Sequence, residues 1–376
     1  MTYLPKWQRF LSLPRETLPQ LTAEEARRAL ASTAGELGLE VTEIPSVAPS
    51  FLLLPPGTAP PRILLFGTWH AESVPMAPAA VEGAERLALA ASVVSLGALG
   101  HRAGIVVVPG ASQGSLVLSA LLRAHRDRLK AESTHWLRIG PQAPVRRRVF
   151  LGARGRVVLG LWGGSVNPYR IRDQIVSKLR DEAYGPRPLD FELLHKLAAQ
   201  RAPLDFLEEC LGDPESISGE GEERLRRALF EPRGQVLSPP VPHPDRPRAW
   251  LALEIAENME PADLLERVRT LASGSEVRMA EGFLWDRVSI HHPGVQAAIK
   301  LSKRVSEGPE IWPAAPWVTP SGLFTRELGT PMVEWSIPIA PSTAIRFPKP
   351  AEFDAIVGEL SDLLLQTLEE VAKVGA

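Results

Sequence analysis

The sequence has little of what several protein classes require. Among its 376 residues is one cysteine, Cys210, which excludes an internal disulfide and a cysteine-based metal cage. No run approaches the roughly 18 apolar residues of a membrane span, and the opening residues MTYLPKWQRF have no signal-peptide core. We therefore expect a cytoplasmic protein with no membrane partner. Since 42 Lys and Arg face 44 Asp and Glu, the net charge of −2 predicts no nucleic-acid partner.

Asparagine and methionine are also scarce, whereas proline is abundant. Asn167 and Asn258 are the only asparagines, and the chain has 5 Met against 36 Pro. Few thermolabile residues together with proline-rich loops are typical of a heat-tolerant source, although a GC-rich genome biases composition in the same direction.

The first 150 residues predict alternating helices and strands. Residues 22–38 have a helical pattern, with Thr22 and Glu25 in capping-box spacing and Gly38 at the end. The apolar runs FLLLPP, RILLFG and GIVVV read as buried strands, separated by helical patterns at 79–97 and in SLVLSALLRAHRDRL. This alternation predicts an α/β fold with a mainly parallel sheet covered by helices on both faces.

The pattern changes near residue 149. From there to residue 287 the segments VVLGLW, NPYRIRDQIVSKL, AWLALEIAE, PADLLERVRTLAS and EVRMAEGFLW form a β-α-β-α-β series, typical of a small helix-backed sheet. Helix and strand patterns resume at 291. We therefore predict an α/β domain in two parts, 1–150 and 288–376, interrupted by a smaller α+β domain at 151–287. Within it, 185–247 is an irregular, proline-rich and charged insertion that is either a docking arm or a loop decoration.

A histidine and a carboxylate follow one of the buried strands. In RILLFGTWHAESVP, His70 and Glu72 stand two apart after the strand, where ligands bind in open parallel sheets. In an extended loop both side chains point to the same side, so His70 could bind a metal that Glu72 orients or bridges. The alternative is a loop histidine bonded to backbone beside a solvated Glu72.

These residues carry a resemblance to a known family. H-x-E-x-V-P after an apolar strand resembles the H-x-D-x-V-P segment of the zinc-dependent carboxypeptidase and deacylase family, which includes acetylornithine deacetylase, succinyl-diaminopimelate desuccinylase, glutamate carboxypeptidase and aminoacylase. RGRVVLGLWGGSVNPYRIRDQIVSKL is similar to the start of the family's inserted lid, with Asn167 at a helix N-terminus. HHPGVQAAIKL and TPSGLFTRELGTPMVEWSIP resemble its return to the catalytic domain. The resemblance implies a ferredoxin-like lid that also forms a homodimer contact.

The family's two-zinc site is only partly matched. His70 stands at the first histidine ligand, and Glu72 where an Asp orients it. The loop that carries the bridging Asp is shortened to PMAPAAVEG, whose acids are Glu82 and the following Glu85. The Glu pair that holds metal and activates water falls at Ser112 and Gln113, neither of which is a carboxylate base.

Two further ligand positions and a substrate position also differ. The acidic ligand before the lid falls near Gly140, and the last histidine falls in SIPIAPSTAIRFPKP, whose charged residues are Arg346 and Lys349. The lid position that often carries a substrate-binding Arg falls at Ala256. One His and one Glu are too few for a zinc site.

The leading hypothesis is therefore a family member that has lost two-metal hydrolysis. This hypothesis predicts no cofactor. It would use the old cleft to bind a small amino-acid- or peptide-like ligand, or serve a structural role. The cleft residues would be His70, Glu72, Ser112, Gln113 and Arg346. The alternative is an active amide hydrolase, a peptidase or an N-acyl amino acid deacylase, with zinc in a site rearranged around His70 and completed by His101, His125 or His135.

A metal-free route to hydrolysis uses Ser112 as the nucleophile. The alternative catalytic residues are therefore Glu72, for the metal route, and Ser112, for the serine route. G-A-S-Q-G at 110–114 lies between a strand and a helix, as in a nucleophile elbow. Its general base would be His243 or the pair His291–His292. The simpler interpretation is a Gly/Ser turn at the start of a helix.

Five tryptophans near predicted strand ends either stack on a ligand or fill core edges: Trp69, Trp162, Trp312, Trp317 and Trp335.

Overall fold

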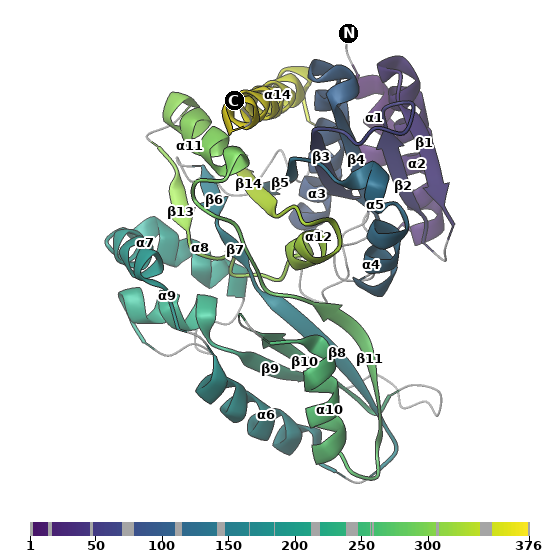
Figure 1. Cartoon of the computed structure of the whole chain (residues 1–376). Coiled ribbons are helices and arrows are strands. Elements are labelled where there is room, and N and C mark those ends of the chain that lie inside the picture. The colour runs from purple at the N-terminus through teal and green to yellow at the C-terminus, as the bar shows by residue number, and fades with distance from the viewer. Residues whose placement is uncertain are drawn as a thin grey trace. The chain divides into compact units, whose positions relative to one another are not determined.

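A computed structural model describes most of the chain. The described residues are 3–13, 17–45, 48–69, 79–109, 115–140, 147–164, 166–183, 185–211, 219–237, 247–255, 257, 259–305, 308–338 and 348–374. Contacts divide the chain into two compact units (Figure 1). Unit 1 is Met1–Val149, Val288–Glu310 and Phe324–Ala376, and unit 2 is Phe150–Arg287 and Ile311–Leu323. Within the described parts, no helix has the length and apolar character to cross a membrane.

An eight-stranded sheet with the order β1-β2-β4-β3-β5-β14-β6-β13 is built mainly from unit 1. Its inner strands β4, β3, β5 and β14 are parallel neighbours, whereas β1 and β2 are antiparallel. The predicted α/β fold with a mainly parallel sheet is confirmed. The strands are β1 Glu40–Ile44, β2 Ser50–Leu54, β3 Ile63–Thr68, β4 Ala103–Val108, β5 Ser133–Gly140, β6 Arg148–Phe150, β13 Glu310–Trp312 and β14 Met332–Pro338.

Helices cover both faces of this sheet because its inner strands are apolar on both sides. A Cβ on Gly67 of β3 would meet Leu89 of α3 at 2.8 Å, whereas Phe66 packs edge-on against Phe324 of α12 on the opposite face. The helices are α1 Leu4–Leu11, α2 Pro19–Leu37, α3 Ala79–Ser95, η1 Leu96–Ala98, η2 Gly100–Arg102, α4 Ser115–Ala124, α5 Arg126–Leu129, α11 Pro293–Val305, α12 Ser321–Leu328 and α14 Pro350–Val374.

The predicted start of α2 is wrong, but its predicted end is confirmed. The helix begins at Pro19 rather than after a Thr22 cap, because proline is pre-set for the first helical position. The Thr22 hydroxyl instead donates to the carbonyl of Leu18, one turn back. Gly38 ends the helix with φ +67°, a left-handed conformation that favours glycine.

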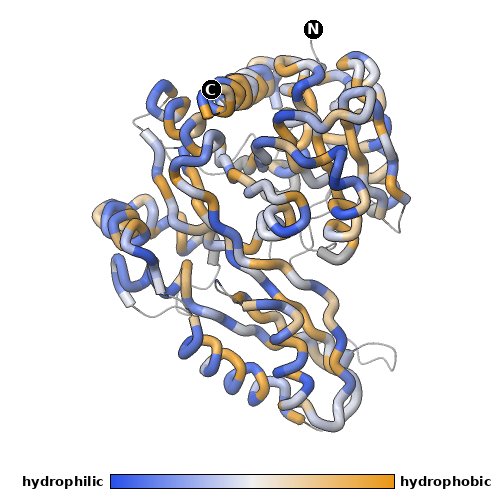
Figure 2. The backbone as a smooth tube through the Cα atoms, in the orientation of Figure 1, coloured by the Kyte–Doolittle hydropathy of each residue, from blue (hydrophilic) through white to orange (hydrophobic). Residues whose placement is uncertain are grey.

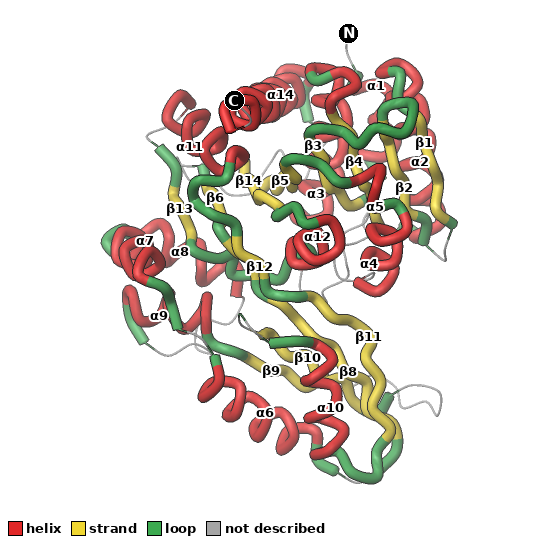
Figure 3. Tube along the Cα trace, in the orientation of Figure 1, coloured by secondary structure: helices red, strands yellow, loops and turns green. Residues whose placement is uncertain are grey.

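Unit 2 contains a four-stranded antiparallel sheet with the order β11-β8-β10-β9. With α6 and α10, the chain order is β8-α6-β9-β10-α10-β11, the ferredoxin-like series of an inserted α+β domain (Figure 3). Strand β9 was not predicted. The elements are β7 Gly152–Ala153, β8 Gly155–Trp162, α6 Pro168–Glu182, β9 Arg233–Leu237, β10 Ala249–Ile255, α10 Pro261–Leu271, β11 Glu276–Phe283 and β12 Asp286–Arg287.

Both helices of this series pack on the same face of the sheet. Leu159 of β8, Leu251 of β10 and Val277 of β11 share one buried cluster with Ile175 of α6 and Val268 of α10. Apolar and polar residues alternate along the turns of α6 (Figure 2), as expected of a helix with one buried side. Asn167 caps α6 by accepting a hydrogen bond from the backbone N–H of Tyr169 at 2.9 Å, as its place before Pro168 predicts.

The insertion is more regular than its composition suggests. Its described residues form β9 and three helices, α7 Pro188–Ala198, α8 Arg201–Leu211 and α9 Gly221–Phe230. Leu194, Leu207 and Leu229, one from each helix, join a core cluster with Phe150 and Trp312. The helices therefore belong to the core of unit 2.

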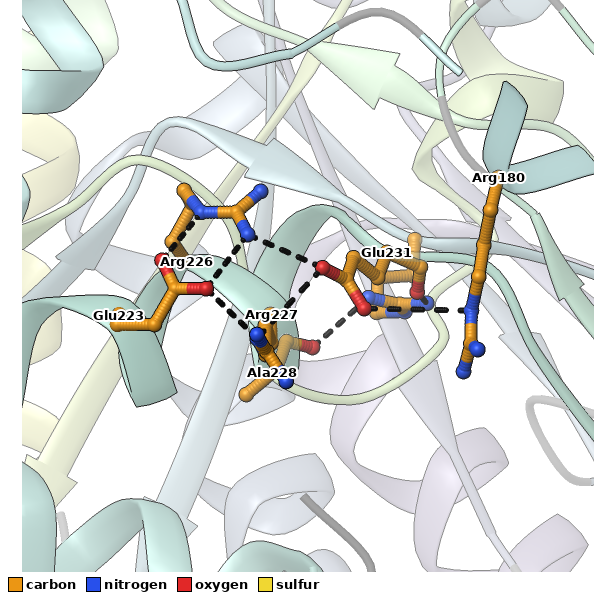
Figure 4. A network of polar contacts seen from close by, with 7 residues as sticks. Arg180, Glu223, Arg226, Arg227, Ala228 and Glu231 are labelled. Atoms are coloured by element: carbon orange, nitrogen blue, oxygen red, sulfur yellow. Dashed lines mark hydrogen bonds and ion pairs between the residues drawn. The ribbon is translucent and has the colours of Figure 1, made fainter. Parts of the chain in front are cut away.

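A polar network surrounds the end of α9 (Figure 4). Glu223 accepts hydrogen bonds from Arg226 and Arg227, and Glu231 pairs with Arg226 and with Arg180 of α6. These side chains are partly exposed to solvent, and such pairs individually stabilise little. They do, however, complement the carbonyl end of the helix with cationic side chains.

Candidate functional site

Four parallel strands of unit 1 end at one edge of the sheet. The register pairs Thr68 at the end of β3 with Val108 at the end of β4, and Gly140 at the end of β5 with Pro338 at the end of β14. Strands β3 and β5 are themselves parallel neighbours, so all four carboxyl ends face the same way. This edge is where open α/β sheets bind ligands.

The connections diverge between β3 and β5. From β3 the chain passes through α3 to β4 on one side, whereas from β5 it continues to β6 and the rest of the chain, and β14 lies on the other side of β5. A crevice forms at a point where connections leave adjacent strands in opposite directions. The geometry therefore places the candidate site around the segments that follow β3 and β5.

The last described residues after β3 are firmly held. Trp69 is 1% exposed; its backbone N–H donates to the carbonyl of Val108 at 3.0 Å, and its indole Nε1 donates to the carbonyl of Pro49 at 2.9 Å. The hydroxyl of Thr68 donates to the carboxylate of Glu85 in α3 at 3.3 Å. The chain therefore reaches residue 70 from a fixed position.

A second anchor lies at α4, the helix that follows β4. Glu327 of α12 accepts hydrogen bonds from Ser119 of α4 at 2.7 Å and from Arg123 of α4 at 3.0 Å. These bonds, that of Arg123 first, lower the pKa of Glu327 to about 2. The carboxylate is thus charged across the physiological range and joins α4 to α12.

The predicted site residues follow these strand ends directly. His70 and Glu72 come after β3, Ser112 and Gln113 after β4, and Arg346 after β14; all five lie outside the described residues. The three segments that contain them therefore begin at one edge of one sheet.

Comparison with solved structures identifies this architecture. A metallo-carboxypeptidase of the M20 family from Sulfolobus solfataricus matches with a TM-score of 0.62 at 17% identity, over 92% of this chain and 96% of that one. A di-peptidase from Saccharomyces cerevisiae matches with a TM-score of 0.67 at 13% identity, over 98% and 96% of the two chains. Human carnosine dipeptidase 1 matches with a TM-score of 0.66 at 12% identity, over 98% and 97%.

The chain has the M20 metallopeptidase fold. The fold implied by the sequence resemblance is thereby confirmed. No protein-family model matches the sequence, and no curated protein sequence matches it.

The M20 fold raises the question of whether this chain has ligands for a metal pair. In the sequence of the segments 70–78, 110–114, 141–146 and 339–347, the residues of ligand type are His70 and Glu72. In the described parts of the chain, no three His, Cys, Asp or Glu side chains converge as a metal would require. Since a catalytic zinc normally has three protein ligands and a metal pair needs bridging carboxylates, the two ligand-type residues of these four segments are by themselves too few for a metal pair.

The histidines that were candidates to complete the site lie at the opposite ends of the strands. His101 is in η2, directly before β4, and His125 directly precedes α5, which leads into β5. His135 is near the start of β5, 1% exposed, and its Nε2 lies 3.0 Å from the hydroxyl of Ser133. The M20 fold thus separates all three from the edge at which the His70 segment begins.

The structure describes the two elements that flank the predicted nucleophile elbow and two of the three histidines considered as its general base. Strand β4 and helix α4 do flank residues 110–114. However, His292 accepts a hydrogen bond from the N–H of Gly294, and a Cβ on Gly294 would lie 2.8 Å from His135. His291 and His292 therefore lie near the amino end of β5, and His243 falls outside the described residues. Among the histidines that the structure describes in unit 1, none lies at the carboxyl edge.

Two interactions of this site had no sequence signal. The Glu327 contacts join residues about 200 positions apart, and the bond between Thr68 and Glu85 depends on how α3 crosses β3. Glu85, a possible metal ligand on sequence grounds, bonds to the strand end in the structure, whereas the side chain of Glu82 is not described.

Proposed function

We propose that this protein is a divergent relative of the M20 peptidases that binds a small amino-acid- or peptide-like ligand at the carboxyl edge of its sheet without two-metal hydrolysis. The observation that carries the proposal is the composition of the segments after β3, β4, β5 and β14, in which His70 and Glu72 are the only ligand-type side chains. Gln113 cannot take a proton from water as a carboxylate does.

The same segments retain chemistry suited to an anionic ligand. The single charged side chain in 339–347 is Arg346, and a guanidinium can bind a carboxylate through two parallel hydrogen bonds without a metal. Ser112 and Gln113 add neutral donors and acceptors. A free amino acid, an N-acyl amino acid or a short peptide carries the carboxylate that such a set would recognise.

Metal content tests the first half of the proposal. We expect tag-free protein, soaked in excess zinc and desalted, to retain less than one zinc per chain by elemental analysis. Two zinc ions per chain would contradict the proposal and support an active hydrolase. In that case, chelator-sensitive hydrolysis of dipeptides or N-acyl amino acids that His70→Ala abolishes would assign a rearranged metal site, whereas chelator-resistant hydrolysis that Ser112→Ala abolishes would assign the serine route.

Ligand binding tests the second half. In a thermal-shift screen of N-acetyl amino acids and dipeptides, we expect a hit whose shift is lost in Arg346→Ala and partly kept in Arg346→Lys, because lysine preserves the charge but not the bidentate geometry. Arg304→Ala is the control, since Arg304 is an exposed arginine at the end of α11. Equal shifts in Arg346→Ala and Arg304→Ala would refute a role for Arg346.

A further inference from the structure

One face of the four-stranded sheet in unit 2 is not used by the helices of the ferredoxin-like series. Since α6 and α10 pack against Leu159 of β8 and Leu251 of β10, the alternate residues of these strands point to the other side, which we call the open face. Val158 and Trp162 of β8 and Trp250 and Ala252 of β10 are half-buried there rather than buried.

A row of neighbouring residues, one from each strand, crosses the open face at one end of the sheet. The register places Leu237 of β9 opposite Trp250 of β10, Trp250 opposite Gly160 of β8, and Gly160 opposite Arg278 of β11. Leu237 is 49% exposed, and the Arg278 side chain is 64% exposed. The row thus presents a leucine, an indole and an arginine side by side.

The glycine in this row makes room for two indoles. A Cβ on Gly160 would meet the ring of Trp162 at 2.5 Å and that of Trp250 at 3.0 Å, so both rings lean over its backbone. Their centroids are 5.9 Å apart with the planes at 73°, and the Arg278 guanidinium lies 5.2 Å from the centroid of the Trp162 ring. We call Trp162, Trp250 and Leu237 the aromatic ridge.

The charged side chains of the open face compensate one another. At the end of the sheet away from the ridge, Arg233 bonds to Glu254, and Arg156 bonds to Glu281 at 2.6 Å. Beside the ridge, Arg278 pairs with Glu276 at 2.5 Å. Each of these three arginines thus has a carboxylate partner, so none of them offers an unpaired charge to a phosphate backbone or to an acidic peptide.

Backbone hydrogen bonding further restricts which kind of ligand the open face can bind. Strands β8 and β10 are the two inner strands, so their N–H and C=O groups are engaged with neighbours on both sides. A peptide that lies across them finds no backbone partner, and each N–H that it buries there costs free energy. Proline has no N–H, and its ring packs well on an aromatic face.

We propose that the aromatic ridge of unit 2 binds a proline-rich peptide of a partner protein in the polyproline II conformation. An apolar ridge with two inclined aromatic rings, beside charges that are paired with one another, suits proline rings. The prior order of a polyproline II chain reduces the entropy lost on binding. This inference concerns a surface of unit 2 and does not rest on the function proposed for the edge of unit 1.

The test uses the full chain and a fluorescently labelled decaproline, followed by fluorescence anisotropy. We expect saturable binding that Trp250→Ala weakens at least about fivefold, as expected for loss of a central aromatic contact, and that Trp250→Phe largely retains. Ala252→Lys adds a charge to the open face without removing a core side chain, and we expect it to weaken binding as well. The matched control is Tyr169→Ala, because Tyr169 is an exposed aromatic of α6 with Arg172 stacked at 5.4 Å.

Several results would overturn the proposal. Absence of saturable binding would do so, as would equal binding by wild type, Ala252→Lys and a Trp250→Ala variant that keeps the wild-type circular dichroism spectrum. Trp250-dependent binding of a labelled ten-residue oligothymidylate tighter than that of decaproline would assign the ridge to single-stranded nucleic acid instead. Binding seen only after residues 238–246, SPPVPHPDR, are replaced by a Gly/Ser linker would make the chain's own proline-rich segment the occupant.

Discussion

Unit 1 and unit 2 each bury a basic side chain completely, but they do so in opposite ways. In unit 2, Arg154 is 0% exposed and remains paired: it donates to the carbonyls of Ala228 and Glu231, and its Nε lies 3.2 Å from the carboxylate of Glu254. In unit 1, His135 bonds to Ser133, and its Nδ1 has no partner among the described residues.

The pKa values follow from this difference. Burial, with Arg233 nearby, lowers the pKa of Arg154 to about 9, so that it stays protonated at neutral pH. Burial and then His292 lower the pKa of His135 to about 3, so that it stays neutral. A fixed charge can therefore be buried where carbonyls and carboxylates surround it, whereas a group without such partners is buried in its uncharged form.

The largest expected effect comes from removing the buried charge. Arg154→Met leaves the carbonyls of Ala228 and Glu231 without their partner inside unit 2 and leaves Glu254 with Arg233 alone. We expect it to lower the free energy of unfolding by about 3–5 kcal/mol in urea denaturation. Arg156→Met is the matched control, because Arg156 is half-buried and the pKa of its partner Glu281 is already raised by burial. Equal losses for the two variants would show that the burial of Arg154 is not what matters.

Acid should destabilise the protein through the other buried side chain, His135 of unit 1. Unfolding exposes the imidazole of His135 to water, where it binds a proton below pH 6.5, whereas the folded state resists protonation to about pH 3. Its contribution to stability is thus intact above pH 6.5 and declines as the pH falls from there toward 3. For His135 alone we expect a loss of about 2 kcal/mol between pH 7 and pH 5.

Urea denaturation at several pH values measures this effect. His135→Gln, which keeps a donor and an acceptor but does not titrate, should flatten the pH dependence, and the remaining slope should reflect His292, whose pKa is lowered by burial to about 4. His101→Gln is the control because His101 is exposed. A His135→Gln profile parallel to the wild type would contradict the assignment.

The smallest loss of stability should come from the hydrogen bonds of Glu327, which join α4 to α12. Glu327→Gln keeps the shape but loses the charge that Arg123 and Ser119 stabilise, and we expect a loss of about 1–2 kcal/mol. Arg62→Ala breaks an exposed pair with Glu132 and should cost less than about 1 kcal/mol. If the two variants lose the same free energy, the bond between α4 and α12 is no more than a surface ion pair.

The fold could be predicted where local pattern and burial agree. The apolar runs at 63–68 and 103–108 have no other place than the middle of a sheet, and both are inner parallel strands. The amphipathic patterns of α6 and α10 correctly predicted helices against one face of a second sheet. Edge strand β9 escaped prediction because RGQVL is short and half-exposed.

The insertion and the site depend on contacts that a local pattern does not contain. Phe206 of α8 packs edge-on against Trp312 and Trp317, more than 100 residues away, and this packing organises a proline-rich stretch into core helices. At the carboxyl edge, the sequence names His70, Ser112 and Arg346, whereas the structure contributes the common edge that their segments share.

The pairing of β5 with β14 has a consequence for biosynthesis. Gly140 and Pro338 are neighbours in the sheet but 198 positions apart in the chain (338 − 140 = 198). At a ribosomal speed of about 5–20 residues per second, β5 waits roughly 10–40 s for its partner strand. During that interval one side of β5 is a free hydrogen-bonding edge on the nascent polypeptide, with which the strand of another chain could pair.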